Sequence, residues 1–177
     1  SLASYLPALA EAAPDSFLGA IEKSLMMPVA PVTRLLTETA ESGSFGSRCW
    51  HSGLLWALET LAWAPKRLAR VALVLAQLSH IQTKGNWGNS PKNSMVGLFR
   101  TWLPQTAADV EQRIKALDLL IAMDPEVAFN ILEGLVQSGQ QFATPAARPK
   151  WRDDDAGAGR SVTETEYRQM HQAARER

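Results

Sequence analysis

The chain carries only scattered residues with the chemistry of a nucleophile, a base or a metal ligand. Cys49 and His51 bring a thiol close to an imidazole in sequence, but successive residues of a helix point about 100° apart, so the two would not aim at each other. His51, His80 and His171 have no second ligand at helical spacing, which a metal-binding face would need. We therefore expect no catalytic residue, no metal site and no cofactor, and we predict that the chain is not an enzyme.

Two loops resemble ligand sites in composition only. Residues 85–92 contain two glycines and a lysine, yet the Gly-Lys-Ser/Thr ending of a phosphate-binding loop is missing and no strand precedes it. The acidic run 153–155 is followed by Gly and Ala residues, and we interpret it as a solvated loop rather than a cation site.

Charge is the more informative feature. The whole chain has 18 basic and 18 acidic residues, but residues 48–104 hold seven basic residues against Glu59 alone, a net charge of +6. Lys66, Arg67 and Arg70 fall in the first turns of a predicted helix, where cations oppose the helix dipole and call for compensation. An acidic protein partner, nucleic acid, pairing with neighbouring acidic segments and simple solvation are all open explanations.

Aromatic residues accompany this basic segment. Trp87 lies in a Gly/Asn-rich loop, where it would either anchor the loop on the helices or be offered to a partner. Trp56 and Trp63 are seven residues apart, so they share a helix face and are expected in the core. The predicted partner-binding residues are Lys66, Arg67, Arg70, Lys84, Trp87, Lys92 and Arg100.

The elements that must position these residues are helices. Apolar residues recur at i, i+3, i+4 and i+7, and no stretch alternates as a half-buried strand would, so we predict an all-α fold. Thr106 with Asp109, Asp124 with Pro125, and Thr163 with Glu166 are typical helix starts. The expected helices cover about 2–12, 15–26, 31–39, 50–64, 65–82, 93–102, 107–123, 125–137 and 164–175.

Three segments share one pattern: a helix, a short turn with Pro14, Pro65 or Pro125, and a second helix. A helical hairpin cannot bury its own apolar face, so stacked hairpins form an irregular α-solenoid similar to HEAT or TPR repeats. An irregular helical bundle is the alternative. We expect a helical domain over 1–139 and, over 140–177, an irregular segment and a terminal helix that packs back on the domain or folds apart from it.

Composition limits the setting of the protein. Of the 177 residues, 46% are hydrophobic, which is enough for a sizeable core. The single cysteine excludes a disulfide framework and fits a reducing compartment. No apolar run approaches the roughly 20 residues of a membrane span and no leader pattern is visible, so we expect a soluble, cytoplasmic protein without a membrane partner.

One further feature is a set of segments spread along the chain, at 14–22, 53–65, 68–78, 86–94, 102–106, 111–113 and 148–153. In these segments the chain resembles the C-terminal helical-repeat part of bacterial STAND-type NTPases associated with antiphage defence.

The resemblance implies a sensor or scaffold region whose ATPase core and effector lie outside this chain. Since the sequence begins at Ser1, we expect a fragment of a larger bacterial protein. The leading hypothesis is a non-enzymatic module that binds protein, either a phage protein or other domains of its parent. The alternative is a nucleic-acid-binding helical module that uses the basic segment 48–104.

Overall fold

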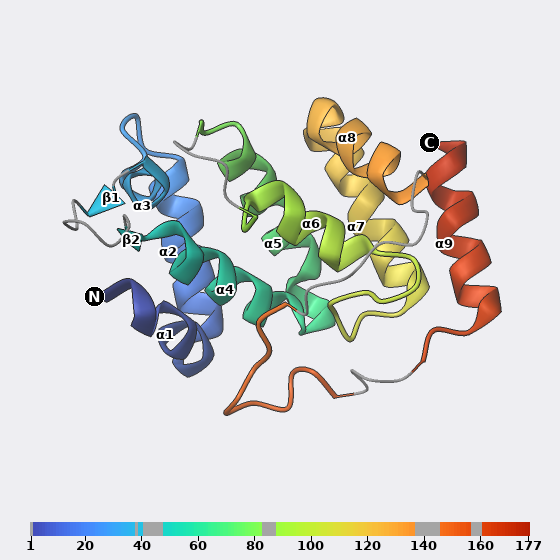
Figure 1. Cartoon of the computed structure of the whole chain (residues 1–177), viewed down its shortest axis with the longest axis horizontal. Coiled ribbons are helices and arrows are strands. Elements are labelled where there is room, and N and C mark those ends of the chain that lie inside the picture. The colour runs from blue at the N-terminus through green and yellow to red at the C-terminus, as the bar shows by residue number, and fades with distance from the viewer. Residues whose placement is uncertain (1, 38, 41–47, 83–87, 137–145, 157–160) are drawn as a thin grey trace.

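The computed structural model describes residues 2–37, 39–40, 48–82, 88–136, 146–156 and 161–177. Within them the fold is helical (Figure 1), as predicted. The elements are η1 (Leu2–Tyr5), α1 (Leu6–Ala12), α2 (Pro14–Leu25), η2 (Pro31–Thr33), α3 (Arg34–Thr37), β1 (Thr39–Ala40), β2 (Arg48–Cys49), α4 (His51–Ala62), α5 (Pro65–Ser79), α6 (Pro91–Phe99), α7 (Val110–Met123), α8 (Pro125–Val136) and α9 (Glu164–Glu176). The sequence pattern had no strand signal, and the two strands form one short antiparallel pair, Thr39 with Cys49 and Ala40 with Arg48.

The centre of the molecule is made by α4 and α5. Helix α4 packs against α1, α5 and α6, while α5 also contacts α2 and α7. The α7–α8 hairpin lies beyond α5 and α6, and α9 packs against α7 and α8 at the far end of the molecule (Figure 1). Eight of the fifteen residues of α5 are buried, so this helix is enclosed by its neighbours over much of its surface.

Proline and local caps set most helix starts. Pro14, Pro65 and Pro125 are each the first residue of their helix, a position where the missing N–H costs no hydrogen bond. Asp124 accepts a bond from the amide of Val127, and Thr163 forms the predicted capping box with Glu166. These starts were predictable because they depend on neighbouring residues only.

The predicted cap at Thr106 is wrong. Helix α7 begins at Val110, and its capping box is formed by Asp109 and Gln112. Thr106 instead donates its hydroxyl to the carbonyl of Ala62, 2.7 Å away, and accepts from the amide of Ala108. A tertiary contact with the end of α4 therefore replaces the local cap.

The two tryptophans of the α4 region differ in burial. Trp63 is 4% exposed, as predicted, but Trp56 is 48% exposed, so the prediction of a core position is wrong for Trp56. The residues share a face, yet only the Trp63 end is covered: its Nε1 donates to the carbonyl of Ala147, and the guanidinium of Arg148 lies over its ring. The cover comes from a segment more than eighty residues away in sequence.

The close approach of η1 to α4 requires glycine at position 53. A Cβ on Gly53 would lie 2.1 Å from the carbonyl oxygen of Ala3, a backbone atom that cannot rotate away. We predict that Gly53→Ala lowers the free energy of unfolding by about 1–3 kcal/mol, measured by urea denaturation.

Gly19→Ala is the matched control. Gly19 also lies in a helix, but an added Cβ there meets nothing within 4 Å, so the higher helix propensity of alanine is expected to stabilise the protein by about 0.5–1 kcal/mol. Equal effects of the two changes would contradict the packing of η1 on α4.

Candidate functional site

Two of the three predicted partner-binding residues of α5 form ion pairs within the chain itself. Arg67 is 2% exposed, and its guanidinium donates to both carboxylate oxygens of Asp15 and, from Nη1, to Asp154 at 3.1 Å. The expectation that Arg67 is a surface residue is therefore wrong. An arginine is rarely buried without such partners, and the partners come from α2 and from the segment that precedes α9.

Arg70 is also paired, although it is partly exposed. Its Nε and Nη2 bind the two oxygens of Glu22 at 2.9 and 2.7 Å, the two-pronged geometry that favours arginine over lysine. These carboxylates of α2 compensate the unfavourable position of cations at the start of α5. Lys66 remains exposed, at the edge of an open pocket of about 480 Å³ that Asp153 and Asp154 also line.

Residues 146–156, which we call the strap, lie across the ends of α1 and α4 without forming a helix (Figure 1). The buried carboxylate of Glu59 accepts from the amide of Ala147 and from the hydroxyl of Ser94. The buried carboxylate of Glu11 accepts from the amides of Lys150 and Trp151 at 2.8 and 2.7 Å. The strap is thus irregular, as predicted for this part of the chain, and is held through its backbone.

Two of the three residues of the acidic run 153–155 in the strap pair with arginines. Asp154 contacts Arg67 and Arg152, and Asp155 binds Arg148. Across the part of the chain that the structure describes, no group of three His, Cys, Asp or Glu residues is arranged to hold a metal ion.

The remaining predicted residues lie on α6 and just after it, or outside the described residues, as Lys84 and Trp87 do. Lys92 is exposed, with its Nζ 3.5 Å from Oδ1 of Asn130. Arg100 follows α6, is half-buried, and has its guanidinium carbon 5.5 Å from the centre of the Trp102 ring.

Arg100 differs from the arginines of α5 because no carboxylate of the described residues pairs with it. Its Nη1 is buried and has no hydrogen-bond partner, and none of the ion pairs found among the described residues includes it. Burial lowers the pKa of this guanidinium from its ordinary value. Beside it, Trp102 and Leu103 are 38% and 41% exposed. We call Arg100, Trp102 and Leu103 the Arg100 surface.

The connection that carries this surface is firmly tied to the core. The buried Arg113 donates from Nη1 to the carbonyl of Arg100, and Gln105 donates its amide N–H to the carbonyl of Gly97. The hydroxyl of Thr106 donates a hydrogen bond to the carbonyl of Ala62, and the backbone amide of Ala107 donates one to the carbonyl of Trp63. The exposed side chains therefore project from a fixed backbone.

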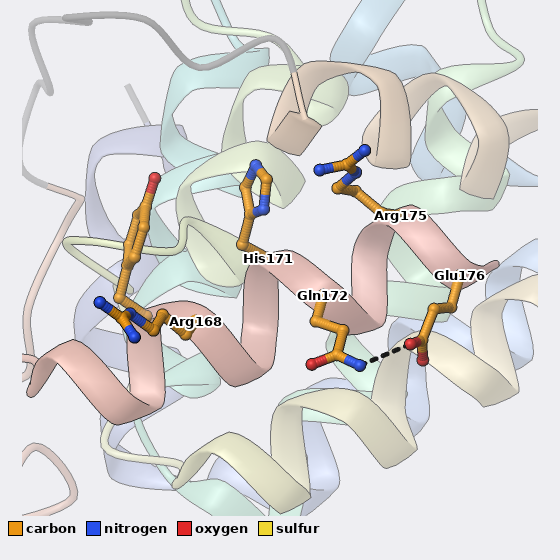
Figure 2. Close-up of a pocket in the computed structure, with 6 residues that line it drawn as sticks. Arg168, His171, Gln172, Arg175 and Glu176 are labelled. Carbon is orange, nitrogen blue, oxygen red and sulfur yellow. Dashed lines mark hydrogen bonds between the residues drawn. The ribbon is translucent and has the colours of Figure 1, made fainter.

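A second depression lies on α9 (Figure 2). It has a volume of about 420 Å³ and is lined only by residues of that helix: Tyr167, Arg168, His171, Gln172, Arg175 and Glu176. His171 and Arg175 project from the same side of α9, while Gln172 donates to Glu176 (Figure 2). Because one helix alone forms its lining and its charges are mixed, it does not enclose a ligand.

Comparisons with protein-family models, curated proteins and solved structures found no match to this chain. The resemblance to STAND-type proteins therefore stays a prediction. Within the described ranges, every helix is too short or too polar to cross a bilayer.

The sequence reasoning missed Glu11 and Glu59 as structural residues. A signal was present for Glu59, because it is the only charged residue among the apolar residues of α4. A charge so placed is rarely buried unless it is paired. For Glu11 there was no comparable signal, since both its donors lie about 140 residues away.

The pairing of Asp15 predicts a pH dependence. The hydrogen bond from Arg67 holds the pKa of Asp15 below its ordinary value of 3.8, so its stabilising contribution is present above about pH 4 and is lost as the pH falls through the lowered pKa. We expect Asp15→Asn to be less stable than the wild type in urea near neutral pH and to match it at low pH.

Asp109→Asn would not serve as a control because it alters a helix cap. Asp153→Asn is suitable because its side chain forms no ion pair with the residues that the structure describes. A difference between Asp15→Asn and the wild type that persists unchanged at low pH would contradict the pairing.

The strap predicts a local effect of Glu11. In Glu11→Ala the amides of Lys150 and Trp151 lose their acceptor, so we expect their hydrogen exchange to accelerate at least tenfold, while the amides of α5 change far less. Hydrogen–deuterium exchange with mass spectrometry measures both regions. Glu111→Ala, at an exposed carboxylate in the first turn of α7, should leave the strap unchanged.

Proposed function

We propose that this chain is a non-enzymatic, helical protein-binding module, part of a larger bacterial protein of the defence type that its sequence resembles. The observation that carries the proposal is the Arg100 surface. Tryptophan and arginine are the residues most enriched in interface hot spots, and here they lie together on a connection with Leu103 exposed beside them.

The scaffold suits this role. The connection between α6 and α7 is hydrogen-bonded to α4 through the hydroxyl of Thr106, to α6 through the backbone amide of Gln105 and to α7 through the carbonyl of Arg100. Little conformational freedom is therefore lost when a partner binds. On this proposal, stacking of the helical hairpins into a solenoid in the parent protein would extend the binding surface beyond these residues.

Nucleic-acid binding is the weaker candidate. It depends on several cations that contact successive phosphates. Arg67 and Arg70 are both engaged by carboxylates of the same chain, so the basic segment presents fewer available charges than its net charge of +6 indicated. Protein binding needs only a small, well-formed surface and is favoured for that reason.

The proposal predicts a specific effect of Trp102. With the chain immobilised and exposed to lysates of phage-infected and uninfected bacteria, we expect a protein ligand that is captured by the wild type regardless of nuclease treatment. Trp102→Ala should weaken binding of that ligand by about 2 kcal/mol, roughly thirtyfold in Kd. Binding of the purified ligand, measured by surface plasmon resonance, provides the comparison.

Trp56→Ala is the matched control, because Trp56 is another exposed tryptophan but lies on the body of α4. It should bind as the wild type does. Capture that disappears on nuclease treatment would instead favour the nucleic-acid candidate, and a ligand indifferent to Trp102 would contradict the proposed surface.

A further inference from the structure

Arg100 is set apart from the other cations of the basic segment by what surrounds it. Arg67 and Arg70 face carboxylates, and Lys92 is an exposed lysine on the outer face of α6. Arg100 is half-buried, and its Nη1 is removed from water with no acceptor. A charge that has lost part of its hydration gains more from an anion than an exposed one does.

The neighbours of Arg100 restrict the kind of anion. Trp102 and Leu103 are exposed and apolar, and Thr101 between them and Arg100 is buried. A single cation on an apolar surface matches a carboxylate with apolar residues next to it better than it matches a chain of phosphates, which requires several cations.

We propose that Arg100 receives an aspartate or glutamate side chain of the protein partner, while Trp102 and Leu103 cover apolar side chains that flank that carboxylate. This inference rests on the proposed function and adds the chemistry of the partner. Because Nη1 is buried, the carboxylate would be received by the other edge of the guanidinium, where Nε and Nη2 lie side by side and can bind both of its oxygens. A cation–π contact with Trp102, whose ring centre is 5.5 Å from the guanidinium carbon, places the apolar ring next to the charge.

The geometry favours arginine at this position over lysine. A lysine would carry the same charge but lacks the planar pair of donors that binds two carboxylate oxygens at once. Two substitutions therefore separate the contribution of the charge from that of the paired donors. Arg100→Met removes both, whereas Arg100→Lys keeps the charge and removes only the paired donors.

The test uses random peptides displayed on phage and selected on the full chain. We expect the selected peptides to be enriched in Asp or Glu adjacent to aromatic or aliphatic residues. Arg100→Met should weaken the binding of such a peptide at least about tenfold and Arg100→Lys by less. Lys115→Met, which removes the charge of an exposed lysine on α7, should have no effect.

A double-mutant cycle then assigns the contact. Replacing the peptide's acidic residue by its amide should cost the wild type about tenfold in Kd and cost Arg100→Met almost nothing, because the two groups act on each other. Thermal melting of each variant verifies that it is folded.

Two results would overturn the inference. Selected peptides could require Trp102 for binding and yet bind Arg100→Met as tightly as the wild type. That result would contradict the contact between Arg100 and a carboxylate but not the proposed protein-binding function. A single-stranded oligonucleotide that binds more tightly than any selected peptide, and that depends on Arg100, would reassign the residue to phosphate.

Discussion

A carboxylate taken out of water needs hydrogen-bond donors, and the interior of a helix has none to spare because its amides already bond to its own carbonyls. Glu11 and Glu59 are in this situation near the ends of α1 and α4. The strap meets the need, since its amides have no helical partners. Its position then covers Trp63 and brings Asp154 to Arg67. The ion pairs between α2 and α5 and the burial of α4 thus belong to one connected arrangement.

The same arrangement marks where prediction from sequence succeeds. Helices that start at Pro65, at Pro125 or at Thr163 depend on the geometry of a few neighbouring residues, and these starts were predicted. Trp56 and Thr106 were misplaced for one reason: their environments are decided by segments distant in sequence. The sequence pattern identified the helix face that Trp56 and Trp63 share. It contained no information on how far along that face the strap would extend.

The candidate site shows the same division. Counting charges along the chain identified the basic segment, including Arg100, but it could not distinguish a paired arginine from an unpaired one. That difference depends on α2, which supplies Asp15 and Glu22 to Arg67 and Arg70. Within the described parts of the chain, no carboxylate pairs with Arg100 in this way. The pairing of Arg67 and Arg70 within the chain therefore could not be predicted by counting charges, and neither could the contrast between them and Arg100.

Binding through a half-buried cation has consequences for kinetics. The chain as a whole has a formal net charge of zero, so little long-range attraction would draw an acidic partner to Arg100. On the proposed mode of binding, the charge acts only after contact, when the apolar residues around it exclude water and strengthen its interaction with the carboxylate. Such a contact prolongs the complex rather than speeding its formation. Since exposed charges at a distance are the ones that salt screens most, affinity at this surface should depend on salt only weakly, unlike binding by a row of phosphate-contacting cations.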